Sequence, residues 1–485
     1  MGSQSNNVER HDLCIVGAGI AGLNALVVAS EYLGPDGSVV LVDRRDRPGG
    51  MWVDTYDYVR LHQPHPMFTA GDIRWNLDED RSHLATKNEV LDHLQHCFEV
   101  AASRVKVTEL FGWEATSHEE TDATVRITCR TDDGKTRVVE ADRLIRALGF
   151  AVEPNDPLEL SSERVRSVSP DHCDMRGPEM AASDAPVWVI GGGKTGMDTA
   201  HTLITKYPDR EVNLVTGSGT FFGKRDQFFP SGIRRWGTGK RLTLVFEKVA
   251  QRYDGTNGAA VREWFHESCG TSLTPEAWNF MFGLLSEAEN RTITAGLRHV
   301  VTDHLEDVVD RDGHTDLVLR SGDILPVEPG SWIVNCTGSL LQRDQPHEPA
   351  VSRDGRVLSI NPRAHVLQLT SFTGYFLTHL LLRDELADAP LYELDLIALR
   401  SRARDDFLPA VAALTMHNLS VIVDRVPAKV MMKCGLDFDR WYPLPRRLFG
   451  AARFLATHRN GREHYRRTLD TLRERHDIAG GVRGG

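Results

Sequence analysis

The chain has 485 residues, of which 41% are hydrophobic and 26% charged, and its formal charge at pH 7 is −11. This composition is that of an ordinary globular protein, so it argues against a disordered, collagen-like or membrane-spanning chain. The excess of acidic residues gives no reason to expect a nucleic-acid partner, because phosphate contacts need a basic surface.

The seven cysteines are scattered along the chain, and no two of them form a CxxC or CxxxxC pair. This spacing argues against a dithiol redox centre and against a tetrahedral zinc site, so we expect no metal. Unpaired cysteines are typical of a reducing compartment, and the sequence shows neither a signal-peptide core nor an apolar run long enough to span a bilayer. We therefore expect a cytoplasmic protein with no membrane partner.

A strand, a glycine-rich turn, a helix and a second strand follow one another near the start of the chain. The apolar run Leu13–Val16 precedes GAGIAG, residues 17–22, a helix is expected over 20–33, and the run Val39–Val42 ends in Asp43. A helix N-terminus offers backbone N–H donors to a phosphate pair, and glycines let the backbone come close to it. The residues predicted to bind a nucleotide here are Gly17, Gly19, Ile20, Ala21, Gly22, Asp43 and Arg44.

Asp43 indicates which nucleotide this first motif would bind. Gly17 would form the tight turn, Gly19 would admit the pyrophosphate, and Gly22 would let helix and strand pack closely. Asp43 lies 21 residues after Gly22, where a carboxylate accepts hydrogen bonds from free ribose hydroxyls. Because a carboxylate would repel a 2′-phosphate, the residues favour FAD or NAD over NADP.

The chain between the two glycine motifs is expected to form a turn, a helix and a β-meander. The turn is RPGGMW, residues 47–52, and an aromatic stretch rich in His and Pro follows it. Residues 87–100 have an amphipathic helical pattern, and residues 105–144 alternate between apolar and polar as strands of a meander do.

A second glycine motif follows Pro186. The run Val187–Ile190 precedes GGGKTG, residues 191–196, and a helix and the strand Val212–Val215 come next. Hydroxyl residues and no acid follow this strand, and four basic residues lie further on: Lys224, Arg225, Arg234 and Arg235. This pattern favours a ribose that carries a 2′-phosphate, and so NADPH over NADH. The residues predicted to bind this second nucleotide are Gly191, Gly193, Lys194, Thr195, Gly196, Thr216 and Ser218.

The remaining segments suggest an insertion, a second meander and a helical tail. Residues 217–296 are rich in aromatics and arginine and helical in pattern, so we expect a helical insertion after the second strand. Alternation resumes over 297–325 and ends in the apolar strand before Cys336. The C-terminal residues have helical patterns, with a charged helix near 460–476.

These elements predict an α/β fold with two dinucleotide-binding, Rossmann-like domains, the second inserted into the first. A lone GxGxxG is a weak signal, and it is the repetition of the motif in matching contexts that carries the prediction. The expected boundaries are 10–165 and 326–400 for the FAD-binding domain, 180–325 for the NADPH-binding domain with its helical insertion 217–296, and 401–485 for a helical C-terminal segment.

The motifs 17–22, 49–52 and 191–196, in this order and spacing, resemble those of the class B flavin monooxygenases. That group contains flavin-containing, Baeyer–Villiger and N-hydroxylating monooxygenases, and its Gly-Gly-x-Trp step matches Gly49–Trp52. The resemblance implies FAD in the first domain, NADPH in the second, and oxygenation through a flavin hydroperoxide. Residues 165–172 depart from the group's linker fingerprint, since they keep a His but lack the Phe and the Gly.

The resemblance also implies roles for residues outside the glycine motifs. Gln63 lies where the family often places an amide side chain near the flavin, and Arg60 is a candidate contact for cofactor phosphates, so these two are the catalytic candidates. Thr373 and Gly374 would offer backbone donors to the flavin at a late helix start. The other implied cofactor contacts are Gly50, Met51, Trp52, Thr337 and Gly338.

The predicted function is oxygenation of a soft nucleophile, an amine nitrogen or a sulfur, on a small-molecule substrate with FAD, NADPH and O2. Two alternatives remain open: an NAD(P)H oxidoreductase that passes electrons to a small acceptor, and a non-catalytic nucleotide-binding redox sensor. The sequence does not identify the substrate, because specificity depends on loops that fold analogy does not reach. A homodimer is the default expectation for the oligomeric state.

Overall fold

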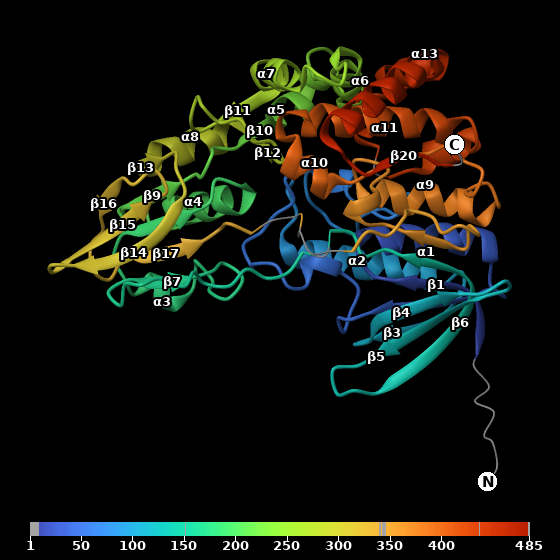
Figure 1. Cartoon of the computed structure of the whole chain (residues 1–485), viewed down its shortest axis with the longest axis horizontal. Helices are drawn as coiled ribbons and strands as arrows, with labels where there is room; N and C mark the ends of the chain where they lie inside the picture. Colours follow the sequence, from blue (N-terminus) through green and yellow to red (C-terminus); the bar gives the residue numbers. More distant parts are fainter. Residues whose placement is uncertain (1–8, 151, 339–340, 342–345, 436, 484–485) are drawn as a thin grey trace, which may run out of the picture.

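The computed structural model describes residues 9–150, 152–338, 341, 346–435 and 437–483. The strands of a first sheet lie at the lower right of Figure 1, and those of a second sheet lie at the left. Helices from the C-terminal part of the chain are stacked above the first sheet and its helices. The fold is therefore α/β with two main sheets, each containing one glycine motif, as predicted.

The first sheet is formed mainly by the N-terminal part of the chain. Its strands are β1 Arg10–Val16, β2 Ser38–Asp43, β3 Lys106–Phe111, β4 Glu114–Glu120, β5 Val125–Arg130, β6 Thr136–Arg146 and β18 Val357–Ser359. Their order is β3-β2-β1-β6-β5-β4, with β18 on β6, and only the pairs β4–β5 and β5–β6 are antiparallel. The expected meander is thus wrong at its start, because β3 extends the parallel part of the sheet beside β2.

Three helices position the first glycine motif on this sheet. They are α1 Ile20–Leu33, α2 Lys87–Ala102 and α9 Thr370–Leu382. Helix α1 packs against both α2 and α9, which explains why most of its residues from Ala21 to Ser30 are buried. Helix α2 begins with a capping box, in which Thr86 accepts from the N–H of Glu89 and the Glu89 carboxylate accepts from the N–H of Thr86.

The second sheet is parallel throughout and contains the second glycine motif. Its strands are β7 Arg166–Val168, β8 Val187–Ile190, β9 Val212–Val215, β13 Leu297–Val301 and β17 Trp332–Asn335, in the order β13-β9-β8-β17-β7. Helices α3 Pro178–Ala181, α4 Lys194–Lys206 and α8 Glu287–Gly296 accompany it. This sheet extends beyond the range 180–325 that the sequence suggested, since β7 and β17 belong to it. The chain then returns to the first sheet through β18, so the segment that forms the second sheet is inserted, along the chain, into the segment that forms the first.

The insertion after β9 contains strands as well as helices, so the expectation of a purely helical insertion is wrong. Strands β10 Phe221–Lys224, β11 Gly270–Ser272 and β12 Leu284–Leu285 form a small sheet, and helices α5 Arg225–Phe228, α6 Leu242–Arg252 and α7 Gly258–Cys269 accompany it. The glycines at 223 and 270 pair across β10 and β11. A separate antiparallel sheet follows β13 and consists of β14 Leu305–Arg311, β15 His314–Leu319 and β16 Ile324–Pro326.

The C-terminal part is mostly helical, as expected. Its helices are α10 Leu396–Arg402, α11 Phe407–Val423, α12 Ala428–Lys433 and α13 Leu444–His476, and the short strands β19 Tyr392–Leu394 and β20 Gly480–Val482 pair with each other. The stretch Arg404–Val423 is long and apolar enough to cross a bilayer, which the sequence reading missed. However, 89% of its apolar window is buried inside the protein, as in a core helix.

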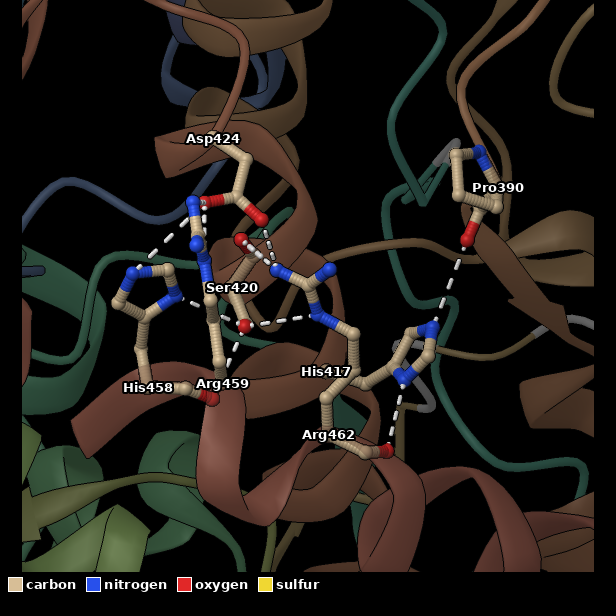
Figure 2. A network of polar contacts seen from close by, with 7 residues as sticks. All are labelled: Pro390, His417, Ser420, Asp424, His458, Arg459 and Arg462. Carbon is tan, nitrogen blue, oxygen red and sulfur yellow. Dashed lines mark hydrogen bonds and ion pairs between the residues drawn. The ribbon is translucent and has the colours of Figure 1, made fainter.

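A polar network joins α11 to α13 (Figure 2). Arg462 donates from Nε to the hydroxyl of Ser420 at 3.0 Å and from Nη2 to the carbonyl of Ser420 at 2.6 Å. Ser420 donates in turn to the carbonyl of His458 at 2.9 Å, and Arg459 forms an ion pair with Asp424 at 2.7 Å. These bonds hold the long helix α13 across the core helix α11.

We predict that the buried amide of Asn418 on α11 is essential for stability. Its Nδ2 donates to the carbonyls of Val366 at 2.6 Å and Tyr392 at 2.8 Å, and its Oδ1 accepts from the N–H of Tyr392 at 2.8 Å. Asn418→Ala leaves these buried backbone groups without partners, so we expect the free energy of unfolding to fall by about 3 kcal/mol. Urea titration followed by tryptophan fluorescence measures this, with Asn460→Ala on the exposed side of α13 as the control. Equal midpoints for the two variants would contradict the prediction.

Candidate functional site

Both glycine motifs lead into helices through a glycine of nearly the same conformation. Gly19 caps α1 with φ −80° and ψ −175°, and Gly193 caps α4 with φ −78° and ψ −173°. A glycine cap has no side-chain acceptor for the N–H groups of the first turn, and neither cap makes a side-chain hydrogen bond. Such helix starts bind anions, because the N–H groups point at the ligand and the helix dipole favours negative charge.

The other glycines of each motif make room for backbone carbonyls. A Cβ on Gly17, which has φ +102°, would lie 2.5 Å from the carbonyl oxygen of Ala147, and a Cβ on Gly22 would lie 1.8 Å from that of Gly17. In the second motif a Cβ on Gly191, with φ +122°, would lie 2.4 Å from the carbonyl oxygen of Cys336, and one on Gly196 would lie 1.9 Å from that of Gly191. The two turns are therefore built in the same way.

The cap glycines differ from these, because no backbone carbonyl lies against the position of a Cβ. No protein atom lies within 4 Å of a Cβ built on Gly193, and for Gly19 the nearest atom is Cα of Gly50 at 3.3 Å. Gly50, with φ +57°, belongs to the Gly-Gly-Met-Trp turn, which folds back over the first motif through a bond from the N–H of Gly49 to the carbonyl of Ala18 at 3.0 Å. This turn therefore lies directly beside the start of α1.

Met51 and Trp52 follow Gly50 in this turn. Met51 is 43% exposed, so its side chain is available to a ligand. Trp52 packs edge-on against Phe68 at a ring distance of 6.0 Å. Gly50, Met51 and Trp52 thus lie next to the first helix start. Their contacts with a cofactor remain predictions.

Asp43 has a structural role that the sequence did not reveal. Its carboxylate is 5% exposed and accepts from the N–H of Ala18 at 2.6 Å and from that of Arg45 at 2.9 Å. It therefore orders the glycine-rich turn, and the predicted bond to a ribose would use its remaining lone pairs. Arg44 points away into a half-exposed ion pair with Glu153 at 2.8 Å.

The end of β9 bears no acid, as the sequence indicated. The hydroxyl of Thr216 faces the carbonyl of Val301 at 3.3 Å, and the imidazole of His304 lies against Gly217. The sequence reading missed His304, because it lies almost ninety residues further along the chain. Ser218 is half-buried in the turn that follows.

The distant basic residues do not gather in this second turn. Arg225 forms an ion pair with Glu289 on α8, and Arg235 donates to the carbonyl of Trp441 at 2.7 Å, beside the start of α13. Their contribution to binding a 2′-phosphate was inferred from sequence proximity alone. The prediction that Arg235 helps to bind the 2′-phosphate of NADPH is wrong, because Arg235 bonds instead to Trp441 in the C-terminal segment.

Two tyrosines connect the first unit with α4 of the second. The Tyr56 hydroxyl donates to the Asp198 carboxylate at 3.0 Å, and the Tyr58 hydroxyl lies 2.6 Å from that of Thr199. Asp198 also pairs with Lys194, the first residue of α4. Burial raises the pKa of both tyrosines, so they stay protonated, and Tyr56 donates to the Asp198 carboxylate. Thr195 lies beside Tyr56 in the first turn of α4.

Gln63 lies in the segment that follows these tyrosines. Its side chain is 8% exposed, and its Oε1 has no hydrogen-bond partner among the described residues. A buried amide oxygen without a partner is costly, so it indicates a missing donor. Arg60 is exposed, and its backbone bridges to Thr86, so the structure provides no contact of its guanidinium with the helix starts.

His62 is a residue of this region that the sequence reading did not assign to the site. Its Nδ1 accepts from the N–H of Leu284 in the insertion at 3.2 Å, and its carbonyl faces Arg225. Burial lowers the pKa of His62 to about 3, and the nearby charges of Lys194 and Arg225 act in the same direction. The ring is therefore neutral, with its proton on Nε2.

The late helix start differs from its prediction. Helix α9 begins at Thr370, and the N–H of Thr373 already bonds to the carbonyl of Leu369 at 3.2 Å. A Cβ on Gly374 would lie 2.3 Å from the carbonyl oxygen of Ala21, so this glycine lets α9 cross α1 closely. Thr337 and Gly338 are exposed after β17, and the Thr337 hydroxyl donates to Oδ1 of Asn335 at 2.7 Å.

The residues present fit two dinucleotides. Each helix start combines N–H groups that no side chain caps with a cap glycine bordered by open space or by another glycine. The first turn is followed by a carboxylate and the second by hydroxyls, as expected for FAD and NADPH. Gln63 adds a buried acceptor without a partner, in a segment that contacts both units.

A family model described as pyridine nucleotide-disulphide oxidoreductase matches residues 11–273, more than half of the chain. The chain therefore belongs to the pyridine nucleotide-disulphide oxidoreductase family. This confirms the predicted fold class. The family is named for a disulphide, whereas no disulphide joins any two of the seven cysteines of this chain, all of which lie in the described residues.

Other comparisons find more distant similarity. An uncharacterized protein of Mycobacterium tuberculosis is 28% identical over 209 residues, which is 40% of this chain and 36% of that protein. Monooxygenase ptmN of Penicillium ochrochloron is 26% identical over 221 residues, 44% of this chain and 36% of that protein. The match thus spans little more than a third of the length of these curated relatives. A flavin-containing monooxygenase from Stenotrophomonas maltophilia has a similar fold, with a TM-score of 0.45 at 15% identity over 75% of this chain and 89% of that one.

We predict that Gly193→Ala weakens the binding of NADPH without disturbing the fold. The added methyl group meets no protein atom within 4 Å, but it would occupy the space where a pyrophosphate approaches the helix start. We expect the dissociation constant to rise by about tenfold or more, as for the loss of a hydrogen bond to a charged group. Fluorescence titration measures it. Gly237→Ala, which also adds a methyl group in open space, is the matched control. Equal affinities in the two variants would contradict this placement of the nucleotide.

We predict that acid destabilises the protein through its buried histidines. Burial lowers the pKa of His62 and His93 to about 3 and that of His365 and His379 to about 4, from an ordinary value of 6.5. Below pH 6.5 the unfolded chain binds protons that the folded chain does not, so stability falls as the pH drops from 6.5. Each histidine contributes a slope of up to about 1.4 kcal/mol per pH unit.

Unfolding in urea between pH 7 and pH 5 tests this prediction. In His62→Asn the asparagine Oδ1 can accept the bond from Leu284. We expect this variant to reduce the dependence of the free energy of unfolding on pH by the contribution of one histidine. His314→Asn, at the exposed start of β15, is the control and should leave the slope unaltered. A stability that rises toward pH 5 would contradict the prediction.

Proposed function

We propose that the protein is an FAD-dependent, NADPH-consuming monooxygenase that oxygenates a soft nucleophile, an amine nitrogen or a sulfur, of a small molecule. The observation that carries the proposal is the pair of equivalent glycine-rich helix starts, joined by Tyr56 and Tyr58. One start is bordered by the Gly-Gly-Met-Trp turn. The family match and a relative described as a monooxygenase support it.

The residues of the chain would divide the work between binding and positioning. Gly19 and its helix start would hold the FAD pyrophosphate with Asp43 at the ribose, and Gly193 and its helix start would hold that of NADPH. Bound FAD would supply two-electron redox chemistry and reaction with O2, and NADPH would supply the hydride. Tyr56 and Tyr58 bond to α4, and these bonds would help to set the distance between the two nucleotides.

Gln63 is the proposed positioning group near the reacting atoms. Its unpartnered Oε1 would accept a hydrogen bond from the bound cofactor or substrate, and this bond would form only in the loaded enzyme. His62, next in the chain, holds the segment against the insertion through its bond from Leu284. Gln63→Ala is expected to lower product formed per NADPH oxidised by about tenfold, through the loss of this bond.

A turnover experiment under 18O-labelled O2 tests the proposal. The FAD-loaded protein is incubated with NADPH and a panel of amines, amino acids and thioethers, and the products are analysed by mass spectrometry. We expect one labelled oxygen atom in each product molecule and one NADPH oxidised per product molecule. In Gln63→Ala we expect more of the electrons from NADPH to reduce O2 to hydrogen peroxide. Steady consumption of NADPH and O2 without a labelled product over the whole panel would contradict the proposal.

The second candidate is an NAD(P)H oxidoreductase that reduces a small acceptor without oxygen transfer. The linker is the observation that favours it. Residues 166–168 form β7 at the edge of the second sheet, and His172, the one match to the family fingerprint there, bonds to Asp156 at the surface. Anaerobic oxidation of NADPH by a quinone, faster than any oxygenation, would select this function. A colourless protein that binds NADPH without oxidising it would instead indicate a redox sensor.

A further inference from the structure

The first half of α13 exposes apolar side chains along its outer face. Leu444 is 58% exposed, Leu448 60%, Phe449 70% and Leu455 54%. At 3.6 residues per turn, positions 444, 448 and 455 lie in one stripe, and 449 lies about 120° around the helix from it. A stripe of large apolar residues in water is unusual and marks an interaction surface.

The second half of the same helix has the opposite character. Its exposed positions are Glu463, Arg467, Thr471, Glu474 and Arg475, which form an ordinary solvated face. The apolar exposure is therefore confined to the start of the helix. A property that changes halfway along one continuous helix is not explained by helix formation itself.

A loop from the insertion extends this apolar surface. Ile233 is 85% exposed and Trp236 61%, in and after the short helix Gly232–Arg235. Arg446 of α13 donates to the carbonyl of Arg235 at 2.7 Å and to that of Gly239 at 2.9 Å, so the loop lies against the start of α13. We define the docking face as Ile233, Trp236, Leu444, Leu448, Phe449 and Leu455.

The fold does not need the docking face to hold α13 in place. The inner side of the helix is fixed to α11 by the network of Ser420, His458 and Arg462 (Figure 2). Further along, Tyr465, Leu469 and Leu472 are buried in the core. The exposed residues make no comparable contribution and are free to meet a partner.

The charge around the docking face indicates the partner. Residues 227–246 and 440–462 contain ten lysines and arginines and no aspartate or glutamate, in a chain with a net charge of −11. Four of them, Arg241, Arg453, Arg459 and Arg462, form ion pairs with Asp439, Glu247 and Asp424, and no ion pair holds the other six among the described residues. Arg81, Arg235 and Arg447 lie close enough together that burial and their mutual repulsion lower the pKa of Arg81. Both Arg81 and Arg235 lie over the ring of Trp441, at 5.4 and 5.0 Å. The cations that remain without an acidic partner in the described structure favour an anionic surface as the partner.

We infer that the docking face binds the surface of an anionic lipid bilayer. Leucine, phenylalanine and tryptophan side chains enter the boundary between headgroups and acyl chains, and flanking arginines are attracted to anionic lipids. A second copy of the chain fits the surface less well, because a two-fold interface would place the same arginines opposite one another. The inference departs from the expectation of no membrane partner, which rested on the search for spanning segments. It is independent of the proposed reaction.

Flotation of the full-length, FAD-loaded protein with vesicles tests the inference. We expect it to float with phosphatidylcholine vesicles that contain phosphatidylglycerol in roughly equal part, and to stay unbound with phosphatidylcholine alone. Phe449→Glu is expected to lower the partition coefficient by about tenfold or more, because it removes a large apolar group from the lipid boundary. Arg234→Glu, on the exposed loop, is expected to lower it by about fivefold and only at low salt.

Thr471→Glu is the matched control, since it makes the same charge change on the exposed face of the second half of α13. Thermal unfolding and FAD content should be the same in all variants. A wild-type protein that does not float with anionic vesicles would overturn the inference, as would equal binding of Phe449→Glu and Thr471→Glu. Analytical ultracentrifugation provides the other decisive result. A dimer without lipid that Phe449→Glu converts into monomers would assign the docking face to a second copy.

Discussion

The contact of a backbone carbonyl with a glycine that has no room for a side chain determines the rest of the site. In both units it occurs twice, at Gly17 and Gly22 and again at Gly191 and Gly196. Each contact lets a helix start directly at the end of its strand, so that the N–H groups of the first turn open at the edge of the sheet. The cap glycine then keeps that opening free. A methyl group at Gly22 or Gly196 would separate helix and strand in its own unit and close the opening there.

Much of this arrangement can be predicted from the sequence, because it depends on local patterns. A strand, three spaced glycines and a helix within some thirty residues specify one turn, and its repetition at Gly191 specifies the second. The helices that start at residues 20 and 87 were predicted at their observed first residues. The same local patterns predict the fold class. In the structure the chain returns to the first sheet after the second unit, where β18 pairs with β6.

What the sequence could not predict depends on contacts between distant residues. The parallel pairing of β3 with β2 is invisible to alternation, which is the same in parallel and antiparallel strands. Arg235 follows β9 in the sequence but lies against Trp441, because the insertion carries it to the C-terminal helices. Gly374 was read as a donor to the flavin, whereas it makes room for the carbonyl of Ala21. The roles of Gln63, Arg60 and the cofactor contacts remain predictions.

The first half of α13 shows what a composition argument leaves out. The net charge of −11 describes the whole chain, and the search for apolar runs detects segments that cross a bilayer. Neither can reveal a basic and apolar face that is assembled from two segments some two hundred residues apart. The contacts of Arg446 with the loop at Gly239 and of Arg235 with Trp441 bring them together.

The central claim is that one chain binds two different dinucleotides at two equivalent helix starts. Calorimetric titration of NADP+ and of NAD+ into the FAD-loaded protein, with FAD counted from its absorbance, tests it most directly. The account predicts one FAD per chain, one NADP+ site with weaker binding of NAD+, and no displacement of FAD by either nucleotide. A colourless protein, or NADP+ that competes with FAD for a single site, would contradict it.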